Sequence, residues 1–302
     1  MFYRAAALAF FIVSGMAARE VAITLDDLPV AQSGANACEL PQLNKITTSL
    51  LRAIESENVP VTVFVVPGNC ARLSPQEFAA TIQRWQRAGA EIGNHTFSHR
   101  SLTSTPVREY TADILKADGI LRQITGRPLR FFRSPMLHTG ADPETKRHLE
   151  RFLGEHGYLQ APVTIDNSDW LFANAYARSL ERRDREAAAR VRREYIPYLE
   201  SVTAFFEARS VEVVGREFPQ IMLLHANRLN AEALPGILTM FRRRGYRFVS
   251  LEEALRDEAY QLPNEYAGKG GFSWIHRWSM TKGMPPKGEP DEPAWVRDLA
   301  ER

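Results

Sequence analysis

Short, continuous apolar runs alternate along the chain with longer stretches of helical periodicity, and this alternation constrains the fold most. The first two runs are VAITL at 21–25 and VTVFVV at 61–66, and helical stretches follow at 43–57 and 74–88. Runs without a polar residue at every second position are typical of strands buried on both faces. The alternation therefore predicts an α/β fold, with a mainly parallel sheet covered by helices.

The same rhythm continues to residue 132 and resumes near residue 220. Further strands are predicted at 91–94, 129–132, 220–225 and 245–250, with helices at 107–125 and 233–244. A charged stretch at about 174–210 interrupts the pattern and includes RRDRE at 182–186. Because acidic residues are interleaved with the arginines, we interpret this insertion as one or two solvated helices, with a binding surface as the alternative.

A chain of 302 residues is long enough for two domains or for one α/β barrel. We expect a single barrel over residues 18–260, followed by a C-terminal extension, 261–302, in which glycine, proline and aromatic residues are frequent. Trp274 and Trp278 in this extension are expected to pack against the barrel. Stacking on a sugar is the alternative for these two side chains.

Composition excludes several classes of protein. The 44% of hydrophobic residues supplies a large core, which excludes a disordered chain. The 38 basic and 36 acidic residues leave a net charge of +2, without the excess of basic side chains that a nucleic-acid partner requires. We therefore expect no nucleic-acid binding, and the oligomeric state is left open.

Residues 1–17 have the organisation of an export signal: a short basic start, an apolar run at 5–13 and small residues before position 18. We expect a cleaved signal peptide and a soluble mature chain that is periplasmic or secreted. The apolar run is shorter than the roughly 20 residues that span a bilayer, so stable membrane insertion after cleavage is not expected. An uncleaved tether and a buried N-terminal helix are the alternatives.

The two cysteines, Cys38 and Cys70, follow two predicted strands that are expected to be parallel neighbours. Both would then lie in loops at the same end of the sheet. In an oxidising compartment this placement favours a disulfide between them. Two separate thiols are the alternative.

Polar residues collect directly after the predicted strands, where an α/β barrel places its active site. Asp26 and Asp27 close the first strand, and His95 and His99 follow the third. Their spacing of four would place both imidazoles on one side of a helical turn, close enough to share a metal ion. An aspartate pair that caps a turn, and two unrelated surface histidines, are the alternative interpretations.

The stretches TLDD, HTFSH, RSP, DNSDW and LLH, in this order between Val21 and Leu255, resemble the five motifs of the polysaccharide deacetylase family. This family is also called NodB-like, or carbohydrate esterase family 4. The resemblance implies a distorted, incomplete (β/α)7 barrel, here with a helical insertion and an aromatic tail. It also implies a metal-dependent enzyme that removes acetyl groups from N-acetylated or O-acetylated glycans.

The resemblance makes Asp26 the general base, which takes a proton from the metal-bound water that attacks the acetyl carbonyl. It makes Asp27, His95 and His99 the ligands of one divalent ion. Zinc is the expected metal, although cobalt, nickel and iron are compatible with the same ligands.

Arg133 would pair with Asp26 and keep it ionised and oriented. His225 would be the general acid that protonates the leaving nitrogen or oxygen, and Asp169 would hydrogen-bond to it. A carboxylate partner raises the pKa of an imidazole, which suits an acid that works near neutral pH. A surface ion pair for Arg133 and a structural buried histidine for His225 are the alternatives.

Pro135, Met136, Trp170 and Leu223 are the expected substrate-binding residues. Trp170 would form an apolar wall, with core packing as its alternative, and Leu223 would line the acetyl pocket. The family usually has an aromatic residue where this chain has Met136, so we expect a different shape for that wall of the groove. A backbone N–H at this position can still stabilise an oxyanion.

The sequence therefore predicts a secreted, metal-dependent deacetylase whose partner is an acetylated glycan. Two other functions fit part of the pattern. The first is hydrolysis of a non-glycan amide or cyclic imide on the same fold, and the second is glycan binding without turnover.

Overall fold

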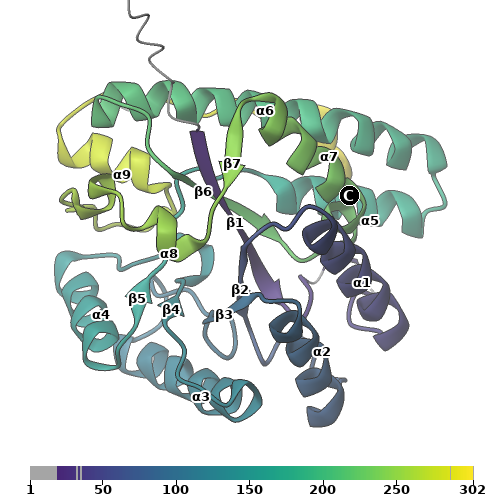
Figure 1. Cartoon of the computed structure of the whole chain (residues 1–302), viewed down its shortest axis with the longest axis horizontal. Coiled ribbons are helices and arrows are strands. Elements are labelled where there is room, and N and C mark those ends of the chain that lie inside the picture. Colours follow the sequence, from purple (N-terminus) through teal and green to yellow (C-terminus); the bar gives the residue numbers. More distant parts are fainter. Residues whose placement is uncertain (1–18, 32, 35, 286, 302) are drawn as a thin grey trace, which may run out of the picture.

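The computed structural model describes residues 19–31, 33–34, 36–285 and 287–301 (Figure 1). The expected signal peptide, 1–17, lies outside the described residues. Within the described part of the chain, no helix is both long enough and apolar enough to cross a membrane.

Within the described residues, seven strands form one sheet, and every pairing between them is parallel. The long strand β1 (Arg19–Leu28) lies between β2 (Val61–Val65) and β6 (Gln220–His225), and its first residues also pair with β7 (Tyr246–Phe248). Beyond β2 follow β3 (Glu91–Asn94), β4 (Phe131–Phe132) and β5 (Leu159–Gln160).

The two sides of the sheet approach each other through the residues that follow β5. Ile165 forms a parallel bridge with Met222 of β6, and the N–H groups of Thr164 and Ile165 both donate to the Ile221 carbonyl. The sheet therefore curves into an incomplete barrel. This confirms the fold class predicted from the sequence.

Helices cover the outside of the sheet (Figure 1). Each presents an apolar stripe to the strands; α1, for example, buries Leu43, Leu50 and Ile54 on one face. The helices of the barrel are α1 (Leu40–Ser56), α2 (Pro75–Arg87), α3 (Val107–Thr125), α4 (Pro143–Glu155), α7 (Arg228–Arg243) and α8 (Leu251–Ala254).

Some element boundaries differ from the prediction. The strands expected at 129–132 and 245–250 are shorter, and β5 was not predicted. The helix expected to begin at residue 233 begins at Arg228, because the Asn227 side chain accepts the Asn230 N–H and caps the helix earlier.

The charged insertion consists of two helices, α5 (Asp169–Glu181) and α6 (Arg185–Val214). The interpretation as a solvated segment was only half right. One face of α6 is charged and exposed, but the other buries Val191, Tyr195 and Phe206. This long helix therefore contributes to the core.

The C-terminal extension packs against the barrel. The short 3-10 turn η2 (Glu258–Gln261) leads into it, and it contains the helices α9 (Trp274–Thr281) and α10 (Ala294–Glu301). Trp274 and Trp278 are buried, and the Trp278 ring lies 5.8 Å from the ring of Phe218. These two tryptophans therefore pack against the barrel and are not exposed for stacking on a sugar.

A disulfide joins Cys38, just before α1, to Cys70, in the loop after β2, with their Cα atoms 5.4 Å apart. It ties together two loops that lie 32 residues apart in the sequence. Both loops lie at the carboxyl ends of β1 and β2, which is also the edge of the sheet that carries the site described next.

Candidate active site

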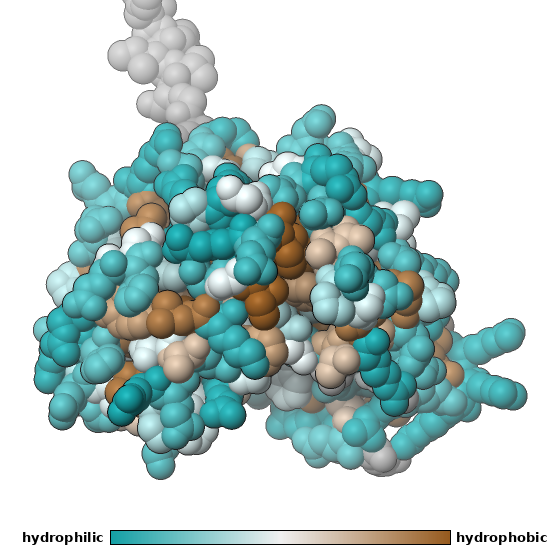
Figure 2. All heavy atoms as spheres, turned by 90° about the horizontal axis from the view of Figure 1, so that it is seen from below, coloured by the Kyte–Doolittle hydropathy of each residue, from teal (hydrophilic) through white to brown (hydrophobic). Residues whose placement is uncertain are grey.

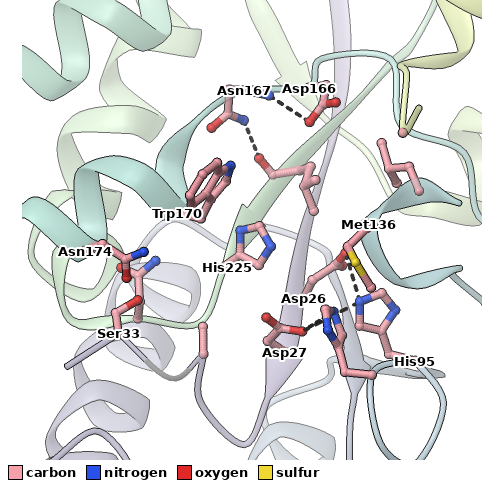
Figure 3. A pocket seen from close by; sticks show the side chains of 16 residues that line it. Asp26, Asp27, Ser33, His95, Met136, Asp166, Asn167, Trp170, Asn174 and His225 are labelled. Atoms are coloured by element: carbon pink, nitrogen blue, oxygen red, sulfur yellow. Dashed lines mark hydrogen bonds and ion pairs between the residues drawn. The ribbon is translucent and has the colours of Figure 1, made fainter. Parts of the chain in front are cut away.

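A cavity of about 490 Å³ opens at the carboxyl ends of the strands (Figure 3). Figure 2 looks onto the molecule from this side and shows apolar side chains gathered beside a hollow. Residues from β1, β6, α5 and the loops after β3 and β4 line the cavity: Asp26, Asp27, His95, His99, Met136, Trp170, Leu223 and His225 are among them.

Asp27, His95 and His99 form a group that can hold a metal ion. Asp27 Oδ1 lies 3.2 Å from His99 Nε2 and 3.7 Å from His95 Nε2, and the three ligand atoms lie within 4.8 Å of one another. Asp27 Oδ1 is buried and has no hydrogen-bond partner among the described residues. Because a buried carboxylate oxygen without a partner is costly, these residues fit a cation.

His95 is held in the orientation and protonation state that a metal ligand needs. Its Nδ1 lies 2.7 Å from the Arg133 carbonyl oxygen, to which it can donate a hydrogen bond. The other ring nitrogen, Nε2, then remains free to bind a metal ion. Burial and the nearby His99 lower the pKa of His95 to about 3. The ring is therefore neutral, which is the form that binds metals.

The prediction that a helical turn brings the two histidines together is wrong. Residues 95–99 form a loop after β3, with left-handed φ angles at Thr96 and His99 of 65° and 53°. The loop is held by its own hydrogen bonds, including one from the His99 N–H to Thr96 Oγ1 at 3.0 Å. Asp113 on α3 also accepts the N–H of Ser98 at 2.9 Å. These bonds, and not helical periodicity, place the two imidazoles together.

Asp26 is buried beside Arg133. Arg133 Nη1 lies 2.7 Å from Asp26 Oδ1 and also donates to Thr24 Oγ1 at 2.7 Å. The guanidinium carbon lies 4.2 Å from the centre of the Phe64 ring. Burial raises the pKa of Asp26, and the adjacent positive charge limits that rise. A carboxylate whose pKa is raised is better suited to accept a proton.

His225 is joined to Asp169 by two hydrogen bonds. Its Nδ1 lies 2.6 Å from Asp169 Oδ1, and its backbone N–H donates to Oδ2 at 2.8 Å. Burial alone would lower the pKa of His225, but the charge and hydrogen bond of Asp169 raise it to about 10. Nε2 remains available at the cavity, so a protonated His225 can act as an acid there (Figure 3).

The expected substrate-binding residues occupy different places. Trp170, which is 51% exposed, lines the cavity together with Leu223 and Met136. Pro135 is buried and is not among the residues that line the cavity. It instead begins the 3-10 turn η1 (Pro135–Leu137), in which Met136 has a left-handed φ of 54°.

Several residues of the site were not predicted. Asn230 donates to Asp169 Oδ2 at 2.7 Å and thus supports the carboxylate that holds His225. Asp166 lines the cavity, and burial, followed by the charge of Glu289, raises its pKa to about 7. Gly271, from the C-terminal extension, also lines the cavity. Of these three residues, only Asp166 lies within one of the motifs and so had a local sequence signal.

Comparison with known proteins gives one family and several relatives. The family model for polysaccharide deacetylase matches residues 14–154. YheN of Bacillus subtilis, whose name refers to polysaccharide deacetylase, is 25% identical over 80% of this chain and 70% of its own length. A Bacillus cereus protein named peptidoglycan-N-acetylglucosamine deacetylase is 24% identical over 77% of this chain and 66% of its own length.

The fold is also found among solved structures. That of a Bacillus anthracis protein described as a pseudoenzyme of carbohydrate esterase family 4 superposes with a TM-score of 0.52. The two sequences are 18% identical, and the match covers 80% of this chain and 66% of the other. Because a pseudoenzyme has this fold, activity has to be argued from the side chains in the cavity.

Proposed function

We propose that this chain, which matches the family model for polysaccharide deacetylase over residues 14–154, is a metal-dependent hydrolase that removes acetyl groups from a glycan. One observation carries the proposal. A single cavity brings together three residues that can hold a metal ion, a buried carboxylate that can accept a proton and a histidine that can donate one. A protein that only binds a glycan has no need of all three.

Asp27, His95 and His99 are the proposed metal ligands, with zinc as the expected ion. When bound, a divalent ion supplies a Lewis acid that polarises a carbonyl and lowers the pKa of water. Three protein ligands would leave a coordination position free for water or substrate, as in catalytic sites.

Asp26 is the proposed general base. It accepts the proton that water loses as the water oxygen bonds to the acetyl carbon. Arg133 keeps this carboxylate ionised and fixes its direction through the contact of 2.7 Å. The Met136 N–H, in the wall of the cavity, is the proposed donor to the oxyanion that forms on the acetyl oxygen.

His225 is the proposed general acid. Its Nε2 gives a proton to the leaving nitrogen, or to the leaving oxygen of an ester, as the bond to the acetyl carbon breaks. The products are acetate and the free amine or hydroxyl. Asp169 orients the ring through Nδ1 and stabilises its protonated form.

The proposed substrate is an acetylated glycan, for which peptidoglycan is one candidate because a relative is named for that activity. Trp170 offers a half-exposed aromatic face to a sugar, and Leu223 closes the acetyl pocket. We also propose a periplasmic or secreted location. The disulfide between Cys38 and Cys70 supports an oxidising compartment.

The experiment is an acetate-release assay on chitin oligomers, peptidoglycan and acetylxylan. The purified protein is first treated with a chelator and then restored with zinc. We expect acetate from at least one of these glycans, only after metal is restored, and loss of release in Asp26→Asn. No acetate from any of them would contradict the proposal. Binding without release would indicate a glycan-binding protein, and turnover of cyclic imides alone would indicate a different hydrolase.

A further inference from the structure

The turn that presents the Met136 N–H has a strained backbone. Met136 and Leu137 have φ angles of 54° and 55°, a left-handed conformation that residues with a side chain rarely adopt. The Leu137 N–H donates to the Ser134 carbonyl, and the His138 N–H donates to that of Pro135. Such a conformation persists where surrounding groups hold it in place.

Arg277, on α9 of the C-terminal extension, is one of these groups. It is fully buried, and its guanidinium donates to the Leu137 carbonyl and, at 2.7 Å, to Thr139 Oγ1. Its Nε donates to the Phe272 carbonyl at 2.8 Å. One side chain therefore ties the turn to the extension.

The surroundings of Arg277 fix its direction. The guanidinium carbon lies 4.2 Å from the centre of the Trp274 ring and 5.3 Å from that of Tyr266. The acceptors of its described hydrogen bonds are neutral oxygen atoms, and burial lowers its pKa to about 10. A buried cation whose hydrogen bonds go to neutral groups is costly for stability, which argues that its contact with the turn matters.

Gly271 approaches the same turn from the cavity side. A Cβ atom on Gly271 would lie 1.9 Å from the Met136 carbonyl oxygen and 3.0 Å from its carbon. The two backbones are thus in direct contact, and both residues line the cavity. Only glycine allows this approach without moving Met136.

The other end of the turn is tied to the loop that carries a proposed metal ligand. His138 Nδ1 lies 2.8 Å from Ser101 Oγ, two residues after His99. The turn is therefore held from two sides, by the metal-binding loop and by the C-terminal extension.

We propose that residues 271–277 of the C-terminal extension are part of the active site, with Arg277 as a positioning residue that holds the Met136 N–H in place. Gly271 lets the extension approach closely enough to form one wall of the cavity. These residues lie outside the region matched by the family model, 14–154. This proposal rests on the proposed function only for the catalytic role of the Met136 N–H. The contacts by which Arg277 holds the turn do not depend on that function.

The test compares Arg277→Met, Arg277→Lys and Gly271→Ala with the parent protein. Hydrogen exchange over residues 134–139 measures whether the turn is held, without any need for activity. In Arg277→Met we expect the amides of Leu137 and His138 to exchange about tenfold faster. We expect kcat for acetate release to fall about 10- to 100-fold, with KM within about threefold of the parent and zinc affinity unchanged.

Arg209→Met is the matched control. Arg209 is also buried and donates to Ser279 on α9 at 2.8 Å, but it does not contact the turn. It is expected to leave exchange at 134–139 and kcat close to parent values. Arg277→Lys should lie between the parent and Arg277→Met, because an ammonium group does not reproduce the planar fork of the guanidinium.

Two results would overturn the proposal: exchange at 134–139 that equals the parent in Arg277→Met, or a rise in KM with kcat unchanged. If Arg277→Met does not fold, Gly271→Ala gives the same test, since the added Cβ displaces Met136 directly. If the parent releases no acetate, the proposed function fails. The hydrogen-exchange data then test only whether Arg277 holds the turn at residues 134–139.

Discussion

Asp169 accepts both the ring Nδ1–H and the backbone N–H of His225, so one buried carboxylate fixes the position of the ring and raises its pKa to about 10. The acid form of His225 is the protonated one. It is present at pH values below this pKa and is lost as the pH rises through it. Activity that depends on the acid should therefore persist at alkaline pH.

Asp169→Asn removes the charge but keeps the shape of the side chain. The pKa of His225 should then fall to the ordinary imidazole value of about 6.5 or below, because burial is no longer offset. At pH 8 roughly 3% of the ring would be protonated, so kcat should fall about thirtyfold, with a smaller loss at pH 6. Measurement of kcat from pH 5 to 10 checks this. If kcat of Asp169→Asn fell at the same alkaline pH as kcat of the parent protein, this would contradict the role of Asp169.

Asp27→Ala should weaken zinc binding. Asp27 Oδ1 is buried, has no hydrogen-bond partner among the described residues, and lies 3.2 Å from His99 Nε2 and 3.7 Å from His95 Nε2. The loss should exceed the roughly 10- to 100-fold that removal of a supporting hydrogen bond costs, because a ligand atom itself is gone. Calorimetric titration with zinc measures the affinity. Asp166→Ala, which changes another carboxylate of the same cavity, should bind zinc as the parent does.

The strands and the residues at their ends could be predicted because the signal is local. Buried parallel strands leave continuous apolar runs, and the polar residues that follow them share one edge of the sheet. Asp26 and His225, which come from distant parts of the chain, are paired neighbours in β1 and β6. The strand β5 left no such signal, since it has two residues and Leu159 is 51% exposed.

The C-terminal contribution to the cavity could not be predicted for a different reason. Arg277 and Leu137 are in contact although 140 residues separate them, and neither lies in a periodic pattern that points to the other. Gly271 lies in a stretch whose composition indicates only a loop. The loop at 95–99 shows the same limit on a smaller scale, because its shape depends on hydrogen bonds that its N–H groups donate to Asp113 on α3.

Arg133→Met should destabilise the fold as well as reduce activity. It leaves the carboxylate of Asp26, which is 2% exposed, without its charged partner. Breaking a buried ion pair from one side costs about 3–5 kcal/mol. Urea unfolding measures this loss. Arg130→Met, which breaks the exposed pair with Glu252, should cost less than about 1 kcal/mol. Equal effects of the two substitutions would argue against a special role for the buried pair.

Trp170→Ala should weaken substrate binding without loss of stability. The indole is 51% exposed at the cavity, so it contributes little to the core but offers a face to a sugar ring. Loss of an aromatic contact of about 1.5 kcal/mol would raise KM roughly tenfold. Leu159→Ala is the control, because Leu159 is also 51% exposed but does not line the cavity. Kinetics on the glycan that releases acetate, together with urea unfolding of both variants, decide the matter. A fall in stability with KM unchanged would mean that Trp170 is a packing residue, because a side chain that contacts only substrate leaves the free energy of unfolding as it was.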